Sequence, residues 1–181
     1  MIILDTNVTS ELMRARPNAA VVAWLADQDP SELFSTVVTV AEISYGLERL
    51  PAGRRRTSLE RSYQSIFVSM ADHILAFDVE AALRYGPLVA DKERIGVVMD
   101  PMDAQIACIA ICHGAAIATR NERDFADCEA SLVNPWRHRG VSRSLDPLGM
   151  TRASMSPAVR SPEYRAKKSS TDFSGSRNVS M

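Results

Sequence analysis

Short apolar runs alternate with longer stretches of helical pattern through the first three quarters of the chain. Runs with the length and composition of buried strands occupy residues 2–4, 33–36, 74–77, 115–118 and, less strongly, 132–133. The segments between them carry helical periodicity or helix-start residues. Because parallel strands need long, usually helical crossovers, the pattern predicts an α/β fold with an open, mainly parallel sheet of about four to five strands flanked by helices.

Turn and capping residues set the expected helix boundaries. Pro17 opens one helix, and Thr39 and Glu42 have the spacing of a capping box. Asp100, followed by proline, is a second clean helix start, and Gly114 is a natural helix end. The sequence therefore places Glu42 in the first turn of the helix that follows the second strand.

Charge divides the chain into two parts. Residues 1–136 hold 12 Lys+Arg against 19 Asp+Glu, whereas residues 137–181 hold 9 against 3 and include ten serines. The second part has no sustained apolar period, which is typical of a segment that cannot bury enough surface to fold. We therefore expect a folded domain over residues 1–138 and a basic, Ser/Arg-rich, disordered extension over 139–181. That extension is either an RNA-tethering arm or a stretch without selected structure.

Membrane and secreted classes do not fit the sequence. No apolar run approaches the roughly 18 residues that a membrane-spanning helix needs, and the N-terminal apolar run ends at Asp5 without a basic segment before it. The three cysteines are odd in number and form no disulfide framework. Cys108 and Cys112 lie on the inward stripe of a helix of small residues, so we expect both to be core cysteines. Because the cysteines form no disulfide framework, we expect a cytoplasmic protein.

Four acidic residues lie where the strands of such a sheet would end or where the next helix begins: Asp5, Glu42, Asp103 and Asp124. Ligands of open α/β sheets bind outside the carboxyl ends of the strands. Three of these residues also have a structural interpretation. Asp5 would cap a helix, Glu42 would complete the capping box, and Asp103 would complement a helix dipole.

The structural interpretations do not explain why the four carboxylates gather at one sheet edge. Neighbouring carboxylates repel one another and raise each other's pKa, and a bound cation relieves that repulsion. An all-carboxylate site with room for water suits Mg²⁺, with Mn²⁺ as the alternative. The chemistry that such a site supports is metal-assisted hydrolysis of a phosphodiester.

Four sequence blocks, in order along the chain, carry a family resemblance: Ile3–Asn7, Thr39–Gly46, Pro101–Ala107 and Ala118–Phe125. Together they resemble the PIN-domain ribonucleases of the VapC toxin family, and the closing segment Leu132–Trp136 is similar to that of its FitB-like branch. The resemblance implies a magnesium-dependent endoribonuclease, the toxin of a type II toxin-antitoxin system. It implies three partners: an RNA substrate, a cognate antitoxin protein and a second copy in a homodimer.

The resemblance also assigns residues. Asp5, Glu42 and Asp103 match the acidic triad of the family, with Asp5 and Asp103 as the metal contacts, and Asp124 matches the fourth acidic position. Asn121 is a further candidate ligand, and Thr6 or Asn7 are candidates to position water or phosphate. Two departures are Thr9, where the family usually has an aliphatic residue, and Asp100, which we interpret as a helix cap. A buried Thr9 hydroxyl without a partner would cost about 1–3 kcal/mol.

Several alternatives remain open at this point. The run Arg54–Arg56 is a candidate RNA contact, although such a run is more often a solvated helix start. Trp24 belongs to the core or to a dimer interface, and Trp136 packs at the sheet edge. Phosphatase and receiver-domain functions each lack a required group, since Asn7 replaces the second aspartate of the first class. The competing function is a catalytically inactive PIN-like protein-binding module.

Overall fold

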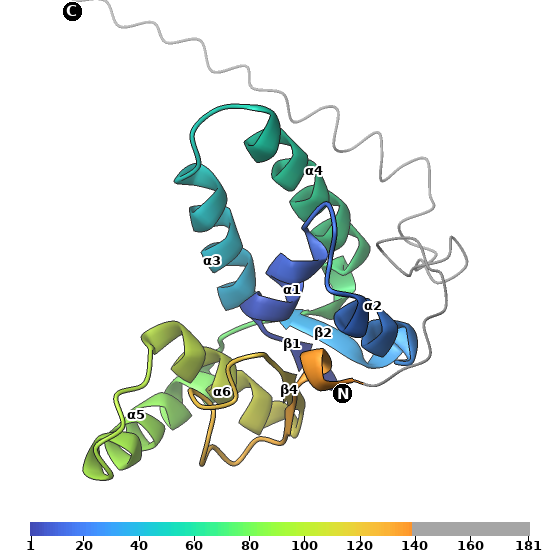
Figure 1. Cartoon of the computed structure of the whole chain (residues 1–181). Helices are drawn as coiled ribbons and strands as arrows, with labels where there is room; N and C mark the ends of the chain where they lie inside the picture. The colour runs from blue at the N-terminus through green and yellow to red at the C-terminus, as the bar shows by residue number, and fades with distance from the viewer. Residues whose placement is uncertain (139–181) are drawn as a thin grey trace, which may run out of the picture. The chain divides into compact units, whose positions relative to one another are not determined.

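A parallel sheet forms the centre of the protein (Figure 1). The structure is a computed structural model that describes residues 1–138, so the extension expected over 139–181 lies outside the described residues. The five strands are β1 (Ile2–Leu4), β2 (Leu33–Thr36), β3 (Ile74–Leu75), β4 (Ala116–Ala118) and β5 (Leu132–Val133). Their order is β3-β2-β1-β4-β5, and every neighbouring pair is parallel. The predicted open α/β sheet is confirmed.

Helices cover both faces of the sheet. They are α1 (Thr6–Leu12), α2 (Ala19–Ala26), α3 (Val37–Glu48), α4 (Arg54–Ser69), α5 (Val79–Arg94) and α6 (Pro101–His113), with short 3-10 turns η1 (Pro30–Glu32), η2 (Ala71–His73) and η3 (Pro135–Arg137). Leu4 packs with residues of α1, α2, α3 and α4, whereas Ile3 packs with residues of α5 and α6. Within residues 1–138, no helix has both the length and the apolar character needed to cross a membrane.

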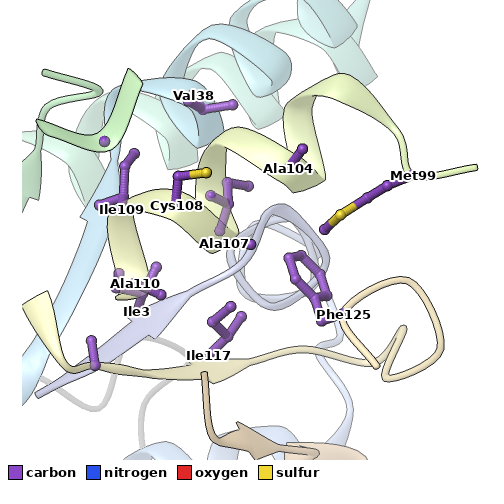
Figure 2. Packing of buried hydrophobic residues seen from close by; sticks show 13 residues of the cluster. Ile3, Val38, Met99, Ala104, Ala107, Cys108, Ile109, Ala110, Ile117 and Phe125 are labelled. Carbon is purple, nitrogen blue, oxygen red and sulfur yellow. The ribbon is translucent and has the colours of Figure 1, made fainter. Parts of the chain in front are cut away.

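Helix α6 has six buried residues and contains many small side chains. Ala104, Ala107, Cys108 and Ala110 are fully buried, which lets the helix backbone approach the sheet closely (Figure 2). They lie in one cluster with Ile3 and other residues of the sheet. The predicted core role of Cys108 is confirmed, and burial raises the pKa of its thiol to about 11, so this cysteine is unreactive at neutral pH.

The predicted capping box at Thr39 and Glu42 is wrong. Helix α3 starts at Val37, and its N-cap is Thr36, whose Oγ1 accepts a hydrogen bond from the Thr39 backbone N–H at 3.1 Å. The last residue of β2 thus caps the helix directly. Thr39 lies inside the helix, Glu42 lies beyond its first turn, and the capping explanation for Glu42 no longer holds.

Other boundaries differ less. Helix α2 begins at Ala19, because the Asn18 side chain, and not Pro17, supplies the cap. Strand β3 is only two residues long, Ile74–Leu75, where four were expected. The Asp100 cap is confirmed, since its carboxylate accepts from the Met102 N–H at 2.8 Å. The end of α6 at Gly114 is also confirmed, with that glycine at a φ of 58°.

The strand order places a ligand-binding edge beside β1. Strands β2 and β3 lie on one side of β1, and β4 and β5 lie on the other side. The second and third strands thus add on one side of β1, and the last two add on its other side. In open α/β sheets, ligands bind outside the carboxyl ends of the strands at the point where the strand order reverses in this way. The turns that follow β1 and β4 meet there.

Candidate active site

Asp5 is the central residue at the carboxyl edge of the sheet. Its side chain is 1% exposed, and it is also the N-cap of α1. One carboxylate oxygen, Oδ1, accepts from the Thr6 N–H at 2.6 Å, and Oδ2 accepts from Asn7 Nδ2 and from Thr119 Oγ1, both at 2.8 Å. A carboxylate oxygen has two acceptor positions, so these donors leave one free position, on Oδ1. The capping interpretation of Asp5 is confirmed, and it is compatible with one further contact.

Strand register explains the bond between Asp5 and Thr119. Leu4 of β1 is paired with Ala118 of β4, so the next residue of each strand lies at the same edge. The Asp5 backbone N–H donates to the Ala118 carbonyl at 3.0 Å, which closes the pair. Thr119 is fully buried and also accepts from the Asn121 N–H at 2.9 Å. It therefore links the turn after β1 to the loop after β4.

A row of threonine hydroxyls holds Glu42. Thr6 Oγ1 donates to Glu42 Oε2 at 2.5 Å, Thr39 Oγ1 lies 3.5 Å from Thr6 Oγ1, and Thr36 Oγ1 lies 3.2 Å from Thr39 Oγ1. Because a hydroxyl has a single proton and Thr6 gives its proton to Glu42, Thr39 is the donor in the contact with Thr6. The row runs from the end of β2 to the carboxylate and fixes one of its oxygens.

Burial raises the pKa of Glu42, the hydrogen bond from Thr6 opposes that rise, and the negative charges of Asp5 and Asp100 add to it. Glu42 is half-buried. Its carboxylate is thus held in place and binds a proton more readily than an exposed glutamate does.

Asp103 shows most clearly that the carboxylates lie close together. It is half-buried in the first turn of α6, and burial raises the pKa of its carboxyl from the usual 3.8 to about 7. The charges of four other carboxylates add to the rise: those of Asp5, Asp124, Asp100 and Glu42. Within residues 1–138, no hydrogen-bond donor is paired with its carboxylate. The structure therefore places the four predicted acidic residues close enough for their charges to act on Asp103.

Asp124 lies in the loop after β4, and its charge acts on Asp103. It is half-buried and accepts a hydrogen bond from the Asn121 side-chain amide. Asn121, which the sequence suggested as a ligand, therefore acts here as a support for Asp124. The predicted role of Asp124 in catalysis remains a prediction.

The donor set fits a hard divalent cation. Among the described side chains, no group of three or more His, Cys, Asp or Glu residues is placed so that it could hold a metal ion. Mg²⁺ is seldom held by such a group alone, because it usually binds through one or two carboxylates and keeps waters and substrate phosphate as its other ligands. Asp5 has one free acceptor position, and Asp103 has a carboxylate whose charge is raised in energy by its neighbours. These two residues are the candidates to hold the ion.

Sequence reasoning missed Thr119 and the hydroxyl row of Thr36 and Thr39. A signal for Thr119 was present, since it directly follows the fourth strand at the predicted ligand-binding edge. The role of Thr36 was hidden because the capping box was placed three residues too late.

The basic run at the start of α4 includes at least one structural residue. The Arg56 guanidinium forms ion pairs with Glu48 at 2.8 Å and Glu60 at 2.6 Å, and so fastens the turn between α3 and α4. Arg54 and Arg55 are exposed. Contact of this run with RNA remains a prediction.

The chain belongs to the PIN-domain family. The sequence profile of the PIN domain matches residues 2–130, which include all four carboxylates and the whole sheet except β5. The family predicted from the four sequence blocks is therefore confirmed.

Particular relatives are similar over nearly their whole length. The chain is 39% identical over 137 residues to VapC ribonuclease Y4jK of Sinorhizobium fredii, covering 75% of this chain and 98% of the relative. It is 36% identical to toxin FitB of Neisseria gonorrhoeae, covering 75% of this chain and 99% of the relative. The crystal structure of FitAcB from Neisseria gonorrhoeae superposes with a TM-score of 0.70 at 36% identity, covering 76% of this chain and 99% of that chain.

Proposed function

We propose that the protein is a metal-dependent endoribonuclease that acts as the toxin of a toxin-antitoxin pair. The observation that carries the proposal is that Asp5, Glu42, Asp103 and Asp124 lie near one another in a PIN domain that is 36–39% identical to relatives named ribonuclease and toxin. We assign the hydrolysis of RNA phosphodiester bonds to these four residues and place the activity in the cytoplasm, where the substrate is found.

Asp5 and Asp103 would hold the Mg²⁺ ion, with Mn²⁺ as a substitute. When bound, the ion would polarise the scissile phosphate and lower the pKa of the attacking water. Asp5 is oriented for this role by Thr6, Asn7 and Thr119. The protein thus fixes the direction of one ligand before any substrate arrives.

Glu42 and Asp124 are proposed to handle protons and to orient water. Thr6 holds Oε2 of Glu42, so Oε1 is available to accept a proton from the attacking water. The raised pKa of Glu42 suits it to this task better than an exposed glutamate. Asp124 lies in the loop after β4, where its carboxylate accepts a hydrogen bond from the Asn121 amide and its charge acts on Asp103.

Removal of the metal tests the proposal directly. Purified full-length protein should cleave a labelled single-stranded RNA in Mg²⁺ or Mn²⁺, lose the activity in excess EDTA, and regain it when the ion is restored. Cleavage that continues unchanged in EDTA would overturn the metal mechanism. Absence of cleavage with either ion, in protein that still binds its partner, would favour the inactive protein-binding module.

We also propose a cognate antitoxin and a homodimer, as the resemblance implies. A cluster of carboxylates can receive a cationic side chain of an inhibitor. Co-expression with the product of the neighbouring gene should suppress growth arrest and yield a complex that survives co-purification. Failure to recover a complex would indicate a stand-alone nuclease, and light scattering of the purified protein tests the dimer.

A further inference from the structure

A polar pocket of about 250 Å³ opens beside the candidate active site. Its lining includes Thr6 and Asn7, which donate hydrogen bonds to Glu42 and Asp5. Its other walls come from the turn after α1, through Arg14, from the loop after β4, through Arg120, and from η3, through Trp136. The pocket therefore lies next to two residues that hold the acidic side chains in place.

Arg120 and Trp136 form a platform in this pocket. The Arg120 guanidinium carbon lies 5.6 Å from the centroid of the Trp136 ring, a cation–π distance. Trp136 is half-buried and packs against the hydrophobic cluster that contains α2, so its ring is held in place. Arg120 is exposed, and no carboxylate among residues 1–138 forms an ion pair with it. Its guanidinium edge is open to an anion.

The acid in the pocket wall does not oppose such a ligand. Glu11 is 7% exposed, and its carboxylate accepts from Arg14 at 2.8 Å and from the Asn18 N–H at 2.9 Å. Its charge is thus used to join α1 to the start of α2. Among residues 1–138, Arg120 has no ion-pair partner, in a domain whose first 136 residues carry seven more acidic than basic side chains. Its positive charge lines a pocket that also contains Thr6 and Asn7, next to the acidic residues that these two hold.

We propose that this pocket, the Arg120–Trp136 pocket, binds one nucleotide of single-stranded RNA next to the scissile phosphate. The Arg120 guanidinium binds the phosphate through its N–H edge, and the base stacks on the guanidinium and indole platform. This inference rests on the proposed ribonuclease function and assigns a substrate contact to it. The guanidinium suits a phosphate, the platform suits a flat base, and the pocket lies beside the carboxylates proposed to hydrolyse RNA. RNA supplies both groups at this position, which is why RNA is favoured over a peptide of the antitoxin.

The test compares Arg120→Gln with Arg123→Gln. Both remove one exposed arginine charge from the same loop, but only Arg120 lines the pocket. Binding of a labelled single-stranded RNA is measured by fluorescence anisotropy in the Asp103→Asn background, where cleavage is blocked, over a series of salt concentrations. Arg120→Gln should weaken binding about tenfold and reduce the slope of log K against log salt by about 0.7. Arg123→Gln should change affinity less than about twofold.

Cleavage kinetics provide a second measurement, made in protein that keeps Asp103. Arg120→Gln should raise KM more than it lowers kcat, because the residue contacts a neighbouring nucleotide and not the reacting atoms. If the wild type cleaves RNA and Arg120→Gln binds and cleaves like Arg123→Gln, the pocket is wrong and the ribonuclease function stands. If Arg120→Gln keeps RNA binding but loses the antitoxin complex, the pocket is a protein contact. A wild type that neither binds nor cleaves RNA overturns both proposals.

Discussion

Two short segments each bring a carboxylate to the same sheet edge, but the two carboxylates differ in how many hydrogen-bond donors surround them. The turn from β1 to α1 presents Asp5, which is 1% exposed and accepts three hydrogen bonds. The start of α6 presents Asp103, which has no donor among residues 1–138 and whose pKa is raised to about 7. The protein supplies three hydrogen-bond donors to the first carboxylate and none, among residues 1–138, to the second. A divalent cation is the species that would complete the second site.

The largest expected effect is on catalysis. Asp103→Asn and Asp5→Asn should each lower kcat by at least about a hundredfold, equivalent to roughly 3 kcal/mol of barrier, because each removes a charge that holds the metal. The two should differ in stability. Only Asp5→Asn turns an acceptor toward the Thr119 or Asn7 donors into an amide N–H, so it alone should destabilise the fold. Asp91→Asn, at an exposed residue of α5, is the control for a lost aspartate charge. Near wild-type cleavage by either variant would contradict its assignment as a metal contact.

Removing the support of Asp5 should have a smaller effect. Thr119→Val deletes the hydroxyl that donates to Asp5 and accepts from the Asn121 N–H. We expect kcat to fall about tenfold, since Asp5 would keep its charge but lose part of its orientation. Thr119→Ser keeps the hydroxyl and should recover most of the activity. Equal loss in both variants would show that the methyl group matters through packing and that the hydrogen bond does not position Asp5.

The comparison also shows what sequence can predict. Asp5 and Asp103 were predicted because each follows a local signal, a strand end or a helix start, and because the blocks around them resemble a family. The donors around Asp5 were not all predicted. Thr119 reaches Asp5 only through the pairing of Leu4 with Ala118, and the register of two strands 114 residues apart is a property of the folded sheet.

The Arg120–Trp136 pocket also depends on contacts between segments that are far apart in the sequence. Its residues come from α1, from the loop after β4 and from the turn after β5, and their separate sequence signals are weak. The raised pKa of Asp103 likewise depends on its burial and on the charges of four neighbouring carboxylates. Sequence therefore predicted the sheet, most helices and the acidic residues, whereas the hydrogen bonds that distinguish the two segments required the structure.

Metal-free stability should depend on pH through Asp103. A carboxyl whose pKa is higher in the folded than in the unfolded protein stabilises the fold when protonated, so this contribution is present below about pH 4 and is lost as pH rises to about 7. At pH 8 in EDTA, Asp103→Asn should therefore be more stable than wild type by roughly 1–2 kcal/mol, or about 4–8 °C in Tm.

Thermal unfolding at several pH values checks this prediction. The advantage of Asp103→Asn should shrink toward pH 4 and also on addition of Mg²⁺, which stabilises only the wild type. A wild type that melts higher than Asp103→Asn in EDTA at pH 8 would show that Asp103 serves mainly to stabilise the start of α6.

The smallest effect concerns a polar group that the β1 to α1 segment leaves unsatisfied. Thr9 of α1 is 1% exposed, and its Oγ1 has no hydrogen-bond partner among residues 1–138. Thr9→Val replaces the hydroxyl with a methyl group of similar size and should stabilise the protein by about 1 kcal/mol, or roughly 4 °C in Tm. Thr39→Val is the matched control, because Thr39 is equally buried in a helix but its hydroxyl is bonded to Thr36 and Thr6. The same substitution should therefore lower Tm at Thr39 and raise it at Thr9. If both variants lose stability, the Thr9 hydroxyl has a partner such as a buried water, and the segment that holds Asp5 is fully satisfied.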